Sequence, residues 1–141
     1  PNCNHAKNQS NTFLYRENFI YDLVQDYLTN LNSFCHTFNI KYKKINYLEM
    51  WAFHTFKNQP IDSIIHNHNI DSDSYEISSI LYFDDGDLGT TLFYDDFNIE
   101  LKEKKEKWYF FESSINHQPK KGISKKDRVV LATSVGLCLK K

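Results

Sequence analysis

The stretch YEISSILYF, residues 75–83, decides the fold, because its alternation and its β-branched and aromatic residues are typical of a β-strand. Further strands are predicted on both sides of it: KINYLEMWAFHTF at 44–56, SIIHNH at 63–68, TTLFY at 90–94 and RVVLATSVGLCL at 128–139. Asn, Pro, Asp and Gly residues separate these runs, most clearly in DDGDLG at 84–89. About seven or eight short strands of this kind predict a small barrel or jelly roll.

One helix is predicted before the strands, at residues 17–38. Its apolar residues recur at spacings of three and four, as in Leu23, Tyr27 and Leu31, while polar residues occupy the other side. Residues 1–16 are polar and without periodicity, so they predict a loose arm or a short edge strand. The expected architecture is a single α+β domain over 1–141, with an arm (1–16), a helix packed on the sheet (17–38) and a jelly-roll core (44–139).

Composition excludes several classes of protein. Lys and Arg number 17 against 18 Asp and Glu, so the strong basic excess of a dedicated nucleic-acid binder is absent. No apolar run approaches the roughly 20 residues that a membrane helix requires. The cysteines Cys3, Cys35 and Cys138 are odd in number and scattered, which favours a reducing compartment and a cytoplasmic location over a disulfide framework.

A histidine pattern indicates a metal site. His66 and His68 lie two residues apart on the predicted strand 63–68, so both side chains point to the same face. The same pattern also fits two exposed histidines at a strand end. His117 follows an aromatic strand, and a jelly roll can bring it opposite the H-x-H pair. Three neutral imidazoles would then bind one face of a divalent metal and leave positions open for small ligands; a solvent-exposed loop histidine is the alternative.

Arg128 is one of only two arginines, with Arg16, and it begins an apolar strand. An arginine that points into a barrel requires an anionic partner, because an unpaired buried charge is costly. Its planar guanidinium matches a carboxylate in bidentate geometry. A structural salt bridge at the strand end is the alternative.

Taken in order, these parts resemble the small iron(II)- and 2-oxoglutarate-dependent dioxygenases, especially the short type of marine bacteria and phages. The resemblance spans about residues 47–135. The matching parts are Trp51, His66-Asn67-His68, SSILYF at 78–83, Gly89, TLF at 91–93, YFFESSINH at 109–117, and Arg128.

The resemblance implies a double-stranded β-helix in which His66, His68 and His117 hold Fe(II). It implies an enzyme that couples the decarboxylation of 2-oxoglutarate to the hydroxylation of a substrate by dioxygen. Arg128 would pair with the far carboxylate of 2-oxoglutarate, and Tyr82 could donate a hydrogen bond to the same group. The sequence does not identify the substrate, and a peptide side chain, a nucleobase, a lipid and a small metabolite all stay open.

The chain departs from the family pattern at three places. The more familiar ligand set is two histidines and a carboxylate. His68 stands where that carboxylate is expected; if His68 does not ligate, Asp71 or Asp73 could complete the site. Val130 stands where the family often has Ser or Thr, and the segment NIDSDSYE at 69–76 is long enough to form a lid or a bulged strand.

Two other classes of protein fit parts of the pattern. One is a different cupin-type metal protein, an isomerase or a cosubstrate-free dioxygenase, with Glu76 as a further ligand. The other is a non-enzymatic jelly-roll binding domain in which the histidines are incidental. The position of Arg128 and the aromatic–Ser–His segment favour the 2-oxoglutarate-dependent oxygenase.

Overall fold

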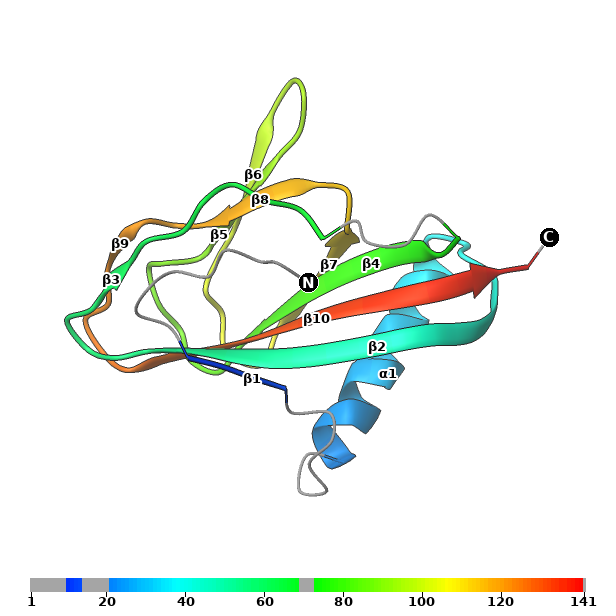
Figure 1. The fold of residues 1–141 in the computed structure, drawn as a ribbon, viewed down its shortest axis with the longest axis horizontal. Coiled ribbons are helices and arrows are strands. Elements are labelled where there is room, and N and C mark those ends of the chain that lie inside the picture. Colours follow the sequence, from blue (N-terminus) through cyan, green and yellow to red (C-terminus); the bar gives the residue numbers. More distant parts are fainter. Residues whose placement is uncertain (1–9, 14–20, 69–72, 141) are drawn as a thin grey trace.

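Strand β10 (Arg128–Leu139) forms the centre of the main sheet (Figure 1). The computed structural model describes residues 10–13, 21–68 and 73–140. β10 is a long, almost uninterrupted apolar run, and it pairs antiparallel with β2 (Tyr42–Thr55) on one side and β4 (Tyr75–Tyr82) on the other. The short strand β1 (Ser10–Phe13) adds to β2, and β7 (Trp108–Glu112) adds to β4. The five strands therefore lie in the order β1-β2-β10-β4-β7.

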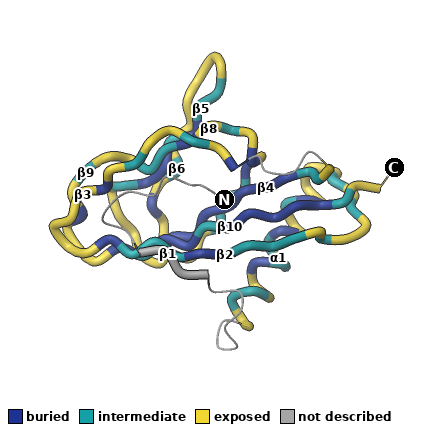
Figure 2. The backbone as a smooth tube through the Cα atoms, in the orientation of Figure 1, coloured by how far each residue is buried: buried dark blue, intermediate teal, exposed yellow. Residues whose placement is uncertain are grey.

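Strand alternation gives the main sheet two buried faces. On one face Leu131 and Val135 of β10 pack in the same apolar cluster as the helix α1 (Tyr21–Thr37). On the other face Val130 of β10 packs with Ile80 and Phe111 of the neighbouring strands. Figure 1 shows α1 on one side of the sheet and the smaller strands on the other, and Figure 2 shows the burial of the central strands. The second face is the one that carries the site described below.

The helix presents Tyr27, Leu31 and Cys35, at i, i+4 and i+8, as its buried stripe. The Tyr27 ring meets the Trp108 ring edge to face at a centroid distance of 5.1 Å, and Trp108 Nε1 donates to Asp26 at 2.7 Å. The helix was predicted over 17–38 and is observed over 21–37, with residues 17–20 outside the described part of the chain. This helix is too short and too polar to cross a bilayer.

Short strands form the second layer. β5 (Thr90–Phe93) pairs with β6 (Asn98–Leu101) and β8 (Asn116–Pro119), and β3 (Pro60–Ile61) pairs with β9 (Gly122–Ile123). Leu92 of β5 reaches the cluster around Ile80 and closes this layer over the main sheet. β8 and β9 lie in a part of the chain for which the sequence predicts no strand. β8 is short and polar and β9 has only two residues, so their pairing comes from tertiary contacts and leaves no alternating pattern.

Candidate metal centre

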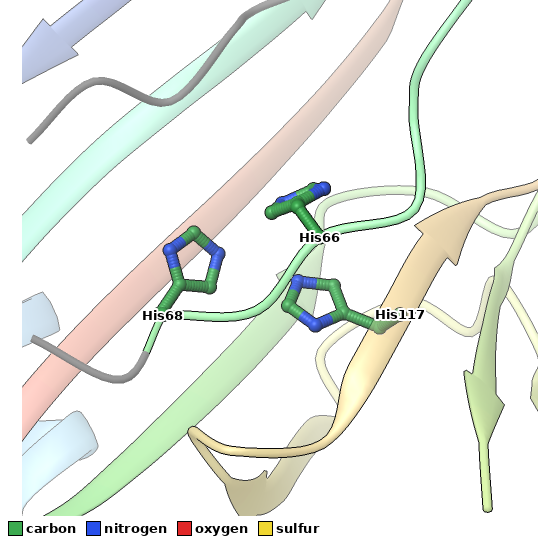
Figure 3. A group of neighbouring side chains, drawn as sticks. All are labelled: His66, His68 and His117. Atoms are coloured by element: carbon green, nitrogen blue, oxygen red, sulfur yellow. The ribbon is translucent and has the colours of Figure 1, made fainter.

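Three histidines converge over the second face of the main sheet. The possible ligand atoms of His66, His68 and His117 all lie within 4.8 Å of one another. The ring centroids are 4.4 to 5.0 Å apart. Figure 3 shows His66 and His68 on one loop and His117 on β8, with the three rings turned toward a common space. This is the convergence that the sequence predicted.

The backbone brings the histidines together in an unexpected way. The segment 63–68 was predicted as a strand, but only His66 pairs there, through an isolated antiparallel bridge to His117. His66 N donates to His117 O at 3.1 Å and His117 N donates to His66 O at 2.8 Å. His68 N donates to Ser113 O at 2.9 Å, so the loop is attached at both histidines. One bridging residue and one further backbone hydrogen bond therefore replace the predicted strand.

Hydrogen bonds set which ring nitrogen of two histidines is free. The Nδ1 atoms of His66 and His117 lie 2.9 and 3.1 Å from the carbonyl oxygens of Ile64 and Ile115. Because a carbonyl oxygen only accepts, each Nδ1 carries the hydrogen and each Nε2 keeps a free lone pair. A neutral imidazole held in this tautomer by a backbone carbonyl is the usual form of a metal-ligating histidine.

Burial keeps His117 neutral. Its side chain is 5% exposed, and desolvation, followed by the nearby His66, lowers the pKa of His117 to about 4. The ring packs edge to face on Phe111 at 5.0 Å, and the His68 ring packs on Trp51 at 5.6 Å. These aromatic contacts hold two of the three imidazoles in place.

A cavity of about 70 Å³ joins the histidines to Arg128, since all four side chains are among its lining residues. Its walls are mainly apolar and aromatic, and they include Phe53, Ile80, Phe111, Val130 and Ala132. A cavity with these walls and a few convergent polar groups is typical of a small-molecule site.

Arg128 is 4% exposed and is held by three contacts at its end of the cavity. Nε donates to Glu103 Oε1 at 2.7 Å, Nη2 donates to the Leu88 carbonyl at 2.8 Å, and the guanidinium lies 5.6 Å from the centroid of the Tyr82 ring. Nη1 has no hydrogen-bond partner in the described part of the chain. The salt bridge that the sequence left as an alternative is therefore present, and one end of the guanidinium stays available.

Tyr82 lies behind Thr90, which lines the cavity. It is fully buried, its hydroxyl is 2.8 Å from the Thr90 hydroxyl, and burial raises the pKa of Tyr82 to about 12. Among the described residues Thr90 lines the cavity and Tyr82 does not. Sequence reasoning missed Thr90, and also Glu103, which lies within a charged run that is typical of solvated loops. The Gly-Thr-Thr start of the strand after the acidic turn was the only available signal for Thr90.

No carboxylate joins the three histidines among the residues that the structure describes. Asp73 is exposed, and Asp71 lies outside the described residues. Glu76 is buried on β4 and accepts a hydrogen bond from the Tyr47 hydroxyl, away from the imidazoles. The ring nitrogens by themselves are a donor set that suits iron, zinc, copper or nickel.

Comparison with known proteins identifies the fold. No family model and no curated protein matches the sequence. A Trichoplax adhaerens prolyl hydroxylase, solved with a hypoxia inducible factor peptide, matches with a TM-score of 0.67 and 12% identity over 94% of this chain. A Pseudomonas putida prolyl-4-hydroxylase matches with a TM-score of 0.65 and 13% identity over 96%. The viral collagen prolyl hydroxylase of Paramecium Bursaria Chlorella virus-1, in a 2-oxoglutarate complex, matches at 0.59 and 15% over 94%.

The chain spans 64% of the length of the first of these proteins, 77% of the second and 80% of the third. At this level of identity the comparison concerns the fold. It confirms the predicted α+β jelly-roll architecture with an N-terminal helix. The chain has the double-stranded β-helix fold of these prolyl hydroxylases, with three histidines gathered in its cavity.

Proposed function

We propose that this protein is an Fe(II)- and 2-oxoglutarate-dependent dioxygenase that hydroxylates a C–H bond of its substrate. The observation that carries the proposal is that one cavity contains both the three imidazoles and the guanidinium of Arg128. The fold of the prolyl hydroxylases supports it, because the same architecture in the viral neighbour accommodates 2-oxoglutarate.

The donor set fits the metal. His66, His68 and His117 would hold it. Three nitrogen ligands on one face of a metal, with bonds of about 2.1 Å, lie roughly 3 Å apart, so the ligand atoms, which lie up to 4.8 Å apart here, would have to approach one another. Small side-chain rotations close that difference. The Nδ1 bonds to Ile64 and Ile115 keep two Nε2 lone pairs directed into the site. Three neutral ligands also leave the full metal charge to attract an anionic cosubstrate.

When bound, the metal and cosubstrate supply the oxidation: 2-oxoglutarate, dioxygen and a substrate C–H become succinate, carbon dioxide and C–OH. The protein's own residues bind and orient the reactants. Phe111 and Val130 exclude water from the cavity beside the imidazoles. Excluding water strengthens the electrostatic interactions within the cavity and suppresses side reactions.

The guanidinium end of the cavity would bind the far carboxylate of 2-oxoglutarate. Arg128 offers Nη1, and Thr90 offers its hydroxyl hydrogen when Tyr82 donates to the Thr90 oxygen. In this arrangement Tyr82 acts on the carboxylate through Thr90. Thr90 would then take the place of the Ser or Thr hydroxyl that the family often has at the position of Val130.

Anaerobic titration of the purified chain with Fe(II) and then 2-oxoglutarate tests the proposal. Chelation of Fe(II) by the 2-oxo acid produces a visible charge-transfer band, and we expect the band to saturate at one cosubstrate per chain. Succinate should then form when oxygen is admitted. Iron binding without the band or any decarboxylation would favour a cosubstrate-free oxygenase instead.

A further inference from the structure

A closed ring of interactions surrounds the Arg128 guanidinium on the side away from the histidines. Glu103 Oε1 accepts from Arg128 Nε at 2.7 Å, and Glu103 Oε2 accepts from Leu88 N at 3.2 Å. Leu88 O in turn accepts from Arg128 Nη2 at 2.8 Å. The Arg128 and Glu103 side chains are each 4% exposed. Both carboxylate oxygens and two of the three guanidinium nitrogens are therefore engaged inside the protein.

Glu103 lies behind Arg128 as seen from the cavity. Arg128 lines both the histidine cavity and an outer hollow that also borders Lys120 and Lys126. Among the described residues, Glu103 lines the outer hollow and is absent from the histidine cavity. The carboxylate thus does not occupy the place of a ligand.

Gly86 makes room for this carboxylate. A Cβ atom at position 86 would collide with Glu103 Oε2, and Gly86 N donates to Glu103 O at 2.9 Å. The acidic turn at 84–89 is therefore packed directly against the ion pair.

We propose that Glu103 is a positioning residue for anion recognition. It fixes the Arg128 guanidinium so that the Nη1 end points into the histidine cavity, and this orientation determines the preference for a 2-oxo acid with a second, distal carboxylate. The inference rests on the proposed function. Because Glu103 balances the charge of Arg128, recognition depends on the direction of the donors more than on net positive charge.

Two substitutions at Glu103 separate the effect of guanidinium position from the effect of charge, and a third at Gly86 checks the first. Glu103→Asp keeps the charge but shortens the side chain by one methylene, so the guanidinium must follow it away from the cavity. Glu103→Gln keeps the length and an oxygen that can accept from Nε, but removes the negative charge and the acceptor for Leu88 N. Gly86→Ala displaces the carboxylate without altering Glu103, so it should reproduce the effect of Glu103→Asp.

The measurement is the affinity of the Mn(II)-loaded protein for 2-oxoglutarate and for pyruvate, which lacks the distal carboxylate, by calorimetry at two salt concentrations. We expect Glu103→Asp and Gly86→Ala to weaken 2-oxoglutarate binding about tenfold or more and to leave pyruvate and Mn(II) affinity unchanged. Glu103→Gln should stay within about threefold of the parent but show a steeper loss of 2-oxoglutarate affinity with salt.

Every other outcome contradicts either this inference or the proposed function. Equal weakening of both 2-oxo acids by Glu103→Asp means a general structural role and overturns the inference, as does unchanged 2-oxoglutarate affinity. A loss in Glu103→Gln as large as in Glu103→Asp means that the length of the side chain at 103 is not decisive, and it also overturns the inference. If the loaded parent binds no 2-oxoglutarate, the proposed function fails and this inference fails with it; parent binding with insensitive variants overturns the inference alone.

Discussion

His66 and His117 exchange both of their backbone hydrogen bonds, at 3.1 and 2.8 Å, although neither neighbour of His66 belongs to a strand. This single antiparallel pair places their ring centroids 4.4 Å apart. The imidazoles are thus brought together by main-chain pairing, which also positions His68 two residues later. Because backbone geometry sets the spacing, the cluster does not depend on a metal to hold its chain segments together.

His117→Ala should lower metal affinity by more than about 100-fold, since even the loss of an outer-shell partner typically costs 10- to 100-fold. One of the three imidazoles is lost while the His66–His117 backbone pair can persist. Anaerobic Co(II) or Fe(II) titration by calorimetry measures the effect. His36→Ala, on the exposed surface of α1, is the matched control. Metal affinity equal to that of the parent in His117→Ala would remove the basis for the site.

Thr90→Val should weaken 2-oxoglutarate binding about tenfold or more, because it removes a hydroxyl that lines the cavity and keeps the shape of the side chain. Thr90→Ser retains the hydroxyl and should bind like the parent. Dissociation constants of the metal-loaded proteins, with pyruvate as the control ligand, measure the difference. Identical 2-oxoglutarate affinities in the Val and Ser variants would exclude a direct contact.

Glu103→Ala should lower the free energy of unfolding by about 3–5 kcal/mol, because it leaves the buried Arg128 guanidinium without its counter-charge. The exposed pair of Lys125 and Asp87 is a useful comparison: Asp87→Ala should change stability by less than about 1 kcal/mol. Urea denaturation followed by circular dichroism measures both. Similar small effects in the two variants would mean that the Arg128–Glu103 pair is open to solvent.

Alkaline pH should destabilise the protein partly through Tyr82. Burial raises the pKa of Tyr82 to about 12, whereas the unfolded chain has an ordinary tyrosine near pH 10. Between these values the unfolded chain loses the phenol proton and the folded chain keeps it, so the free energy of unfolding falls as pH rises. The contribution is of the order of 3 kcal/mol across the window.

Tyr82→Phe removes this titration. Its free energy of unfolding, measured by urea denaturation at pH 9 to 12, should therefore decline less steeply than that of the parent. The difference between the two proteins should stay constant below pH 9. Parallel curves over the whole range would contradict the burial of the ionisable phenol.

The helix and the long strands were predictable because their buried residues follow a regular pattern in the sequence. β4 (Tyr75–Tyr82) and β10 (Arg128–Leu139) are strands on which both faces are largely covered, and Tyr27, Leu31 and Cys35 recur at the spacing of one helix face. The candidate site was also predictable in part. Residue type, spacing and order single out His66, His68, His117 and Arg128.

Tertiary contacts decided where the short strands and several of the site residues lie. The β8 and β9 strands have no alternating pattern, because their partners β5 and β3 supply the order. Glu103 reads as one more charge in KEKKEK, yet it is buried because Arg128, from a strand 25 residues later, meets it there. Thr90 reaches the cavity only where β5 folds over the main sheet. By itself the amino-acid order determined which elements form and which residues could do chemistry. The three-dimensional structure decided which of them meet, since a contact between distant residues leaves no periodic signal in either.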